Sequence, residues 1–167
     1  MAGRGRDGFP VPAPEASLVR VCDLAGRPRG TGFAADEHGT VITSHEAVDG
    51  LARIVLYAAD DRTCVVPAEA VAELPGTDLA LIRTEGLALR PLPVAARASV
   101  AIGTYVRIVA GGWREARVLG TSAVTYTATD RYHLVGAALE LAIGTDGADA
   151  LRLGGGAAGG PVVDAAT

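Results

Sequence analysis

The chain alternates short apolar runs with turn residues over most of its length. Between residues 17 and 84 six such runs follow one another, broken by Gly, Pro and Asp about every ten residues. They read SLVRVC, GTGFAAD, GTVIT, ARIVLYA, TCVVPAEAVAEL and DLALIRT. Short length and β-branched residues favour strands, and no window keeps a helical stripe for three turns. The pattern therefore predicts a β-rich first half.

A second cluster of strands is predicted after a segment rich in Ala, Pro and Leu. The runs GTYVRIVAGG, WREARVLGTSAVTYTAT and YHLVGAALELAIG are followed by a glycine-rich tail. Short strands joined by turns need closure to hide their edges, which favours antiparallel barrels. We therefore predict an all-β protein with a first barrel at residues 17–84, a connector at 85–98 and a second barrel at 99–167.

Composition mainly excludes classes of function. Hydrophobic residues make up 49% of the chain and charged residues 20%, which is ample for a core. The net charge is −4, aromatic residues make up 4%, and there is no basic run, so a nucleic-acid surface is not expected. No run reaches the roughly 20 apolar residues of a membrane helix. Residues 1–16 lack the apolar region of a secretory signal, so we interpret them as a flexible leader and expect a cytoplasmic protein that does not bind membranes.

Few residues are typical of metal or redox chemistry. Cys22 and Cys64 each lie in an apolar, strand-like run, so we expect reduced thiols that pack as small hydrophobic residues. A metal site would need more ligands near them, and the chain has three histidines. We expect no metal and no cofactor. His38 and His133 are interpreted as surface or turn residues, and Trp113 as packing between strands.

Three segments match, in order and in spacing, the motifs of one family. GTGFAADEHGTVITSHEAVDG resembles the histidine segment of trypsin-like peptidases, especially of the bacterial HtrA-like branch. PGTDLALIRTE is similar to the segment whose aspartate orients that histidine, and GGGAAGGPVVD to the Gly-Asp/Asn-Ser-Gly-Gly-Pro segment of the nucleophile. Together they span residues 30–165. The resemblance implies a chymotrypsin-like fold of two antiparallel β-barrels, with a Ser-His-Asp triad in the cleft between them.

The resemblance also assigns the acid and base positions of the triad. Asp78 fits the acid position. A match without gaps over residues 43–49 places the base position on Glu46, and His45 lies one residue early. Family members begin a helical turn here, so one residue corresponds to about 100° of rotation. We expect His45 to point away from the cleft, and a local shift of the backbone would make it an alternative base.

The nucleophile position carries Ala158, whose methyl group cannot attack a carbonyl. The oxyanion hole of the family uses backbone N–H groups, here those of Gly156 and Ala158, which do not depend on the missing hydroxyl. Arg152 stands where the family places the floor of its specificity pocket. A cation there would favour an acidic side chain in a bound peptide; the alternative interpretation is an ordinary exposed arginine.

Three hypotheses of function remain open. In the first, the domain is an inactive peptidase that acts as a peptide-binding or regulatory module, which explains both Glu46 and Ala158. In the second, it is an active serine endopeptidase whose nucleophile was replaced by alanine, which leaves Glu46 unexplained. In the third, it is a structural spacer. The expected partner under the first is a peptide or protein ligand.

The resemblance further predicts an incomplete second barrel. In the family, additional strands follow the Gly-Gly-Pro segment, whereas six residues, 162–167, follow it here. We expect an unpaired strand edge near residues 103–110 or 159–165, covered by the remainder of a longer polypeptide. The similarity is to N-terminal modules of large bacterial sensor or defence-type proteins, and a basic set made up of arginine alone also favours a bacterial source.

Overall fold

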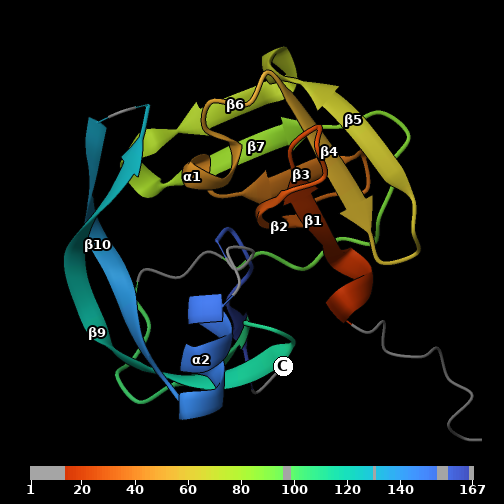
Figure 1. Cartoon of the computed structure of the whole chain (residues 1–167). Coiled ribbons are helices and arrows are strands. Elements are labelled where there is room, and N and C mark those ends of the chain that lie inside the picture. Colours follow the sequence, from red (N-terminus) through yellow and green to blue (C-terminus); the bar gives the residue numbers. More distant parts are fainter. Residues whose placement is uncertain (1–13, 96–98, 130, 154–157, 166–167) are drawn as a thin grey trace, which may run out of the picture.

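The computed structural model describes residues 14–95, 99–129, 131–153 and 158–165. Most of these residues lie in antiparallel strands that form two sheets (Figure 1). Within these ranges helix is confined to the short α1 (His45–Val48), to α2 (Thr145–Leu153) and to three single 3₁₀ turns. The predicted all-β class is therefore confirmed.

The first sheet has seven strands in the order β5-β4-β1-β2-β3-β7-β6. Its strands are β1 (Leu18–Cys22), β2 (Pro28–Ala34), β3 (Thr40–Thr43), β4 (Arg53–Ala58), β5 (Thr63–Pro67), β6 (Val71–Leu74) and β7 (Leu79–Arg83). Six apolar runs give seven strands because the longest run is divided: Pro67 ends β5, and the 3₁₀ turn Ala68–Ala70 leads into β6. Proline cannot donate a ladder hydrogen bond, so a strand readily stops there.

An apolar core fills the inside of this curled sheet. Val19 and Val21 are buried while Arg20 between them is exposed, as the two-residue period of a strand requires. Ile54 and Leu56 of β4 are completely buried against them. Burial of a side chain of this size stabilises the fold by about 1.5–3 kcal/mol. The first barrel is thus the well-packed part of the molecule.

The second sheet has four strands in the order β10-β9-β8-β11. Its strands are β8 (Tyr105–Val109), β9 (Trp113–Ala128), β10 (Arg131–Ile143) and β11 (Val163–Asp164). Of the two alternatives for an unpaired edge, 103–110 is wrong because β8 lies between β9 and β11, whereas β11, within 159–165, is an edge strand, as is β10 among the described residues. Trp113 is half-buried opposite Val109, in keeping with its predicted packing between strands.

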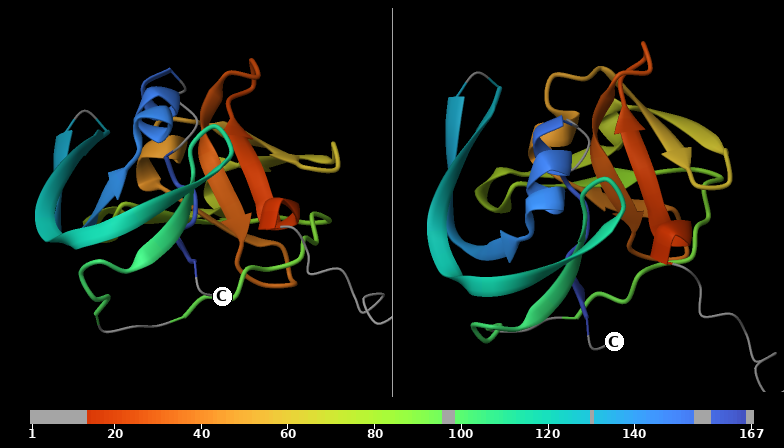
Figure 2. Two further views of the ribbon diagram at one scale, coloured as in Figure 1. Left: turned by 90° about the horizontal axis from the view of Figure 1, so that it is seen from below. Right: turned by 60° about the horizontal axis from the view of Figure 1, so that its bottom comes forward.

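The hairpin of β9 and β10 is much longer than the core beneath it. Only its base packs on the small second core, formed by Val106, Ala116 and Val118. Its far end curls across to the first barrel and lies beside α1 (Figures 1 and 2). Helix α2 follows β10, at a place where the sequence pattern predicts no helix. The hairpin and the 158–165 segment therefore both reach the first barrel from the second half of the chain.

Candidate functional site

Helix α1 carries the expected base segment and begins with two capped amides. Ser44 is the N-cap residue, and its Oγ accepts a hydrogen bond from the Ala47 amide at 3.1 Å. The carboxylate of Asp78 accepts another from the Glu46 amide, also at 3.1 Å. Side-chain oxygens at these positions satisfy helical N–H groups that have no partner within the helix. The acid position is therefore bonded to the helix start itself.

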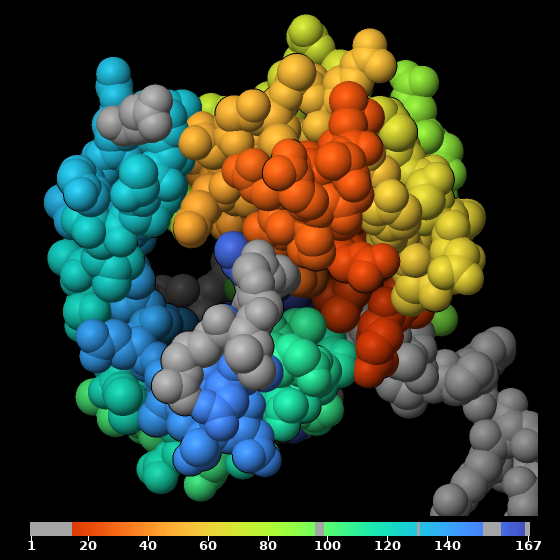
Figure 3. All heavy atoms as spheres, viewed as in Figure 1, coloured from red at the N-terminus to blue at the C-terminus, as the bar shows by residue number. Residues whose placement is uncertain are grey.

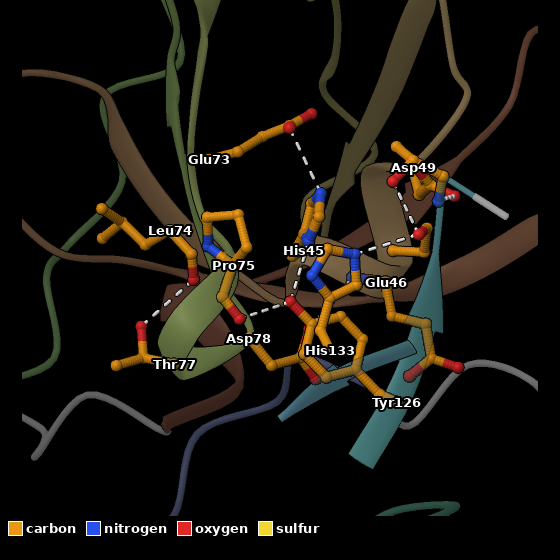
Figure 4. A network of polar contacts seen from close by, with 12 residues as sticks. His45, Glu46, Asp49, Glu73, Leu74, Pro75, Thr77, Asp78, Tyr126 and His133 are labelled. Atoms are coloured by element: carbon orange, nitrogen blue, oxygen red, sulfur yellow. Dashed lines mark hydrogen bonds and ion pairs between the residues drawn. The ribbon is translucent and has the colours of Figure 1, made fainter. Parts of the chain in front are cut away.

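Asp78 owes its position to a tight turn. It follows the 3₁₀ turn Pro75–Thr77 and adopts a left-handed backbone conformation with φ at 51°. Aspartate tolerates this conformation better than most residues. Burial raises the pKa of the Asp78 carboxyl, while the hydrogen bond from the Glu46 amide and the nearby charge of His45 oppose the rise. The side chain accordingly lies partly desolvated beside the start of α1 (Figure 4).

The imidazole of His45 is buried and faces the β9–β10 hairpin. Its Nδ1 lies 2.9 Å from Tyr126 Oη, and the Tyr126 hydroxyl donates to the Pro75 carbonyl at 2.6 Å. Its Nε2 lies 3.2 Å from Glu73 Oε2 without the geometry of a hydrogen bond. The backbone N–H of His45 donates to the Asp78 carbonyl at 3.3 Å, so the contact with the acid position is through the main chain (Figure 4).

Three rings gather around His45. Tyr126 and His133 stack with their centroids 5.0 Å apart, and His45 meets both edge-on, at 5.8 Å and 5.4 Å. His133 lies directly opposite Tyr126 in the hairpin register, so both side chains point to the same face. The interpretation of His133 as an ordinary surface or turn residue is therefore wrong. His38 does lie in an exposed turn, where its amide donates to Asp36.

The tip of the hairpin has a further attachment to the first barrel. The amide of Thr129, whose φ is 53°, donates to Oδ2 of Asp49 at 2.7 Å. Asp49 closes α1 as its C-cap residue. The hairpin therefore contacts both sides of the base segment. Figure 3 shows the surface hollowed between this hairpin, in cyan, and the first barrel, in orange.

Glu46, the residue at the base position, has an exposed side chain. Only its amide takes part in a described hydrogen bond, the one to Asp78. A carboxylate is a weaker general base than an imidazole and deprotonates a serine less efficiently at neutral pH. Whether Glu46 or His45 takes the base role stays a prediction. Among the described residues, the His45 imidazole forms no hydrogen bond with Asp78, and Glu46 contacts Asp78 only through its backbone amide.

The nucleophile segment docks on the first barrel beside α1. The Ala158 carbonyl accepts from the Thr31 amide of β2 at 2.7 Å. Gly159 is packed so closely that a Cβ there would collide with Thr43, Thr31 and the Ser44 amide, and its φ of +89° suits glycine. Position 158 is thus placed next to the start of α1 by its backbone. Gly156, the other expected oxyanion donor, lies outside the described residues, as does the side chain of Arg152 in α2.

The hydroxyl groups near position 158 are already used in structural bonds. Thr43 donates to the Thr31 carbonyl at 2.7 Å, and Ser44 caps α1. Burial, with the nearby carboxylates of Asp78 and Glu46 among others, raises the pKa of Tyr126, which makes its hydroxyl less nucleophilic. Among the described residues no group of His, Cys, Asp and Glu is arranged to hold a metal ion.

Comparison with known proteins identifies the family. Residues 30–167 match the trypsin-like peptidase domain, and the chain belongs to this family. The resemblance predicted from the three sequence motifs is confirmed. The sequence matches no curated protein.

Solved structures confirm the chymotrypsin-like double barrel, with the second barrel incomplete here. The active form of the Rv3671c protease from M. tuberculosis is 21% identical, with a TM-score of 0.67 over 90% of this chain and 66% of that chain. The apo MamO protease domain from Magnetospirillum magneticum is 22% identical, with a TM-score of 0.66 over 92% and 80%. Deg5 is 20% identical, with a TM-score of 0.62 over 90% and 75%. No helix among the described residues has the length and apolar character to cross a membrane.

Sequence reasoning missed Glu73, Tyr126 and His133. Tyr126 and His45 are separated by 81 residues, and their contact depends on the length and curl of the β9–β10 hairpin. An alternating pattern reports which side chains share a face of a strand, but not where a long hairpin ends in space. One sequence feature could have indicated this contact: the run WREARVLGTSAVTYTAT is long for a strand. The small second core packs against only part of it, so its far end must pack elsewhere.

Proposed function

We propose that this domain is a catalytically inactive member of its family that binds a peptide or protein segment in the hollow between the hairpin and the first barrel. The observation that carries the proposal is Ala158, which occupies the nucleophile position of the sequence motif and whose carbonyl accepts from the Thr31 amide. Because a methyl group cannot form an acyl-enzyme, the peptidase reaction lacks its first step. In another serine peptidase, loss of the nucleophile or of the base costs roughly 10⁶-fold in turnover.

The state of His45, the alternative base, supports the same proposal. His45 Nδ1 is engaged with Tyr126, and the carboxylate of Asp78 is engaged with the Glu46 amide. Because the nucleophile, base and acid positions are not bonded to one another, we expect that restoring one of them by substitution does not restore peptidase activity. The fold retains the backbone of residues 158 and 159, docked against β2 and the start of α1. Peptide binding requires such a backbone surface and no nucleophile. The domain would then act by binding a peptide or protein segment in the hollow, without cleaving it.

As a binding module, the domain would serve a larger polypeptide in the cytoplasm. The support is the analogy with bacterial multidomain proteins of sensor or defence type that carry such domains, together with a match that covers 66% of the Rv3671c protease chain. Fold alone does not fix function, so this context is tested separately. The measurement is fractionation of cells that express the native gene, with antibody detection of the size and location of the product.

A binding assay tests the proposed function directly. Fluorescein-labelled hexapeptides from a positional-scanning library would be titrated with the protein and followed by fluorescence anisotropy. We expect a sequence-dependent rise in anisotropy, no change in peptide mass after overnight incubation, and loss of binding in Ala158→Tyr, whose ring would fill the hollow. The matched control is Ala59→Tyr, in the exposed turn between β4 and β5. Peptide cleavage, or equal binding by both variants, would contradict the proposal.

A further inference from the structure

The distal half of the β9–β10 hairpin lies beyond the second core. We call its residues 121–129 and 131–139 the strap. Neither core of the described molecule contains a strap residue, and among the described strap residues Ala128 alone is buried. On one face of the strap Leu134 is 63% exposed, and on the opposite face Val124 is 42% exposed. Little apolar burial therefore holds the strap in place.

Three hydrogen bonds among the described residues join the strap to the first barrel. The Tyr126 hydroxyl donates its one proton to the Pro75 carbonyl at 2.6 Å, so its oxygen accepts from His45 Nδ1, which is 2.9 Å away. Near the tip, the Thr129 amide donates to Asp49 Oδ2 at 2.7 Å. Each such bond is exchanged for one to water when it breaks, so three of them hold the strap weakly.

Two β-bulges lie between the tip of the hairpin and its base. One falls between Val135 and Ala138 of β10, and the other between Glu140 and Leu141. A bulge leaves a residue unpaired and bends its strand. Gly136 lies within the first bulge, where the absence of a Cβ leaves the backbone freer to rotate. The hairpin therefore has defined places at which it can flex.

These features together favour a local opening of the strap. A region with few buried apolar contacts opens at a lower free energy than the whole domain unfolds. Opening would break the three hydrogen bonds and leave both apolar cores packed. The hollow lies between the hairpin and the first barrel (Figure 3), so a strap that moves would change access to it.

We propose that the strap swings away from the first barrel as one unit, by flexing at the bulges, and that a peptide segment enters the hollow while the strap is open. Tyr126 is the positioning residue that keeps the strap closed, because its hydroxyl bonds to two groups of the first barrel. This inference rests on the proposed peptide-binding function for the entry of a peptide, and on the described contacts alone for the opening.

The Thr129 amide reports the opening in the full chain without any peptide. Its hydrogen bond to Asp49 is made in the closed state, so the amide exchanges with solvent when the strap opens. The Val21 and Leu56 amides serve as references, because β1 and β4 have paired strands on both sides. In NMR hydrogen exchange corrected for intrinsic rates, we expect Thr129 to exchange at least about tenfold faster than the references. Equal protection would overturn the inference, because the strap would then open only with the whole domain.

Two tyrosines of the strap provide a matched pair of variants. Tyr126→Phe keeps the ring that stacks on His133 and removes both bonds of the hydroxyl. It should speed exchange of the Thr129 amide by about 2- to 10-fold for each bond lost, and leave the reference amides unchanged. Tyr132→Phe makes the same chemical change on the opposite face, where the side chain is 82% exposed, and should leave the Thr129 amide unchanged.

Two results with these variants would overturn the inference. If Tyr126→Phe does not affect the Thr129 amide, the tip frays by itself and the strap does not move as a unit. If Tyr126→Phe speeds the reference amides as much as the Thr129 amide, this tyrosine stabilises the whole fold and does not specifically fasten the strap.

Stopped-flow anisotropy with the labelled hexapeptides distinguishes failure of the inference from failure of the proposed function. If a peptide enters through the open state, its association rate constant should rise in Tyr126→Phe by the same factor as exchange of the Thr129 amide, because more of the protein is competent to bind. An unchanged association rate beside faster exchange would overturn the role of the strap in entry. If exchange responds as expected and the hexapeptides bind to neither protein, the strap opens and the peptide-binding function is wrong.

Discussion

Replacing Gly159 by alanine tests whether the nucleophile segment is docked as the structure has it. A methyl group at this position would collide with atoms of Thr43, Thr31 and Ser44, two of which are backbone atoms that cannot rotate away. The residue also has a φ of +89°, a conformation that L side chains rarely adopt. Two independent penalties therefore act on one substitution.

Two other glycines allow these penalties to be separated. Gly26 has a φ of +81° and open space around the place of a Cβ, so Gly26→Ala carries the backbone strain alone, about 1–2 kcal/mol. Gly144 has neither feature, and Gly144→Ala should lie within about 0.5 kcal/mol of the wild type. Gly159→Ala adds to the strain an overpacking cost of about 1–3 kcal/mol. We expect a total of about 2–5 kcal/mol.

Urea unfolding of the four proteins measures these differences, and thermal melts repeat them. In a chain of this size 1 kcal/mol corresponds to about 2–4 °C, so Gly159→Ala should melt about 4–20 °C below the wild type. The order of stability should be wild type and Gly144→Ala, then Gly26→Ala, then Gly159→Ala. If Gly159→Ala is no worse than Gly26→Ala, residues 158 and 159 do not pack on β2 and α1 and the site description fails.

Three further predictions concern the first barrel. Burial raises the pKa of Asp78, so the folded state binds the proton of this carboxyl more tightly than the unfolded chain does. The stability of the wild type should therefore rise relative to that of Asp78→Asn as pH falls from neutral through the raised pKa. Urea melts at a series of pH values check this, and Asn is a suitable control because its side-chain oxygen still accepts from the Glu46 amide. Ser44→Ala should cost about 1 kcal/mol through loss of the N-cap bond to Ala47, whereas Ser44→Thr should lose less. Leu56→Ala should cost about 2–5 kcal/mol in the same assay, because the side chain is fully buried; a loss under 1 kcal/mol would contradict the packing of the first core.

The fold was predictable because its information is local. Alternation such as Val19, Arg20 and Val21 reports a strand with one buried face, and it does so wherever the strand ends up. Proline explains the one strand break that the pattern missed, after β5. Helix α2 was missed because one glycine and two aspartates within nine residues weaken its periodic signal. Local rules thus gave the class and the two clusters of strands, but not every element.

The site was predictable only as far as its sequence motifs reach. The positions of Glu46, Asp78 and Ala158 follow from segments whose spacing is fixed within a few residues. The bonding of His45 does not, since its partners come from β6 and from a hairpin whose tip is placed by curvature and by a bulge after Val135. Side chains that meet through such a long-range arrangement leave no pattern in a single sequence.

Labelling with a fluorophosphonate probe tests the central claim most directly, because the probe reacts only with an activated hydroxyl. The wild type and Ala158→Ser would be incubated with the probe beside trypsin as a positive control, and covalent adducts would be counted by intact-mass spectrometry. The account predicts no adduct on either protein, since in Ala158→Ser the new hydroxyl would face a base position occupied by Glu46 and a His45 ring bound to Tyr126. A stoichiometric adduct on Ala158→Ser would contradict it and would establish an active serine endopeptidase from which only the nucleophile is missing.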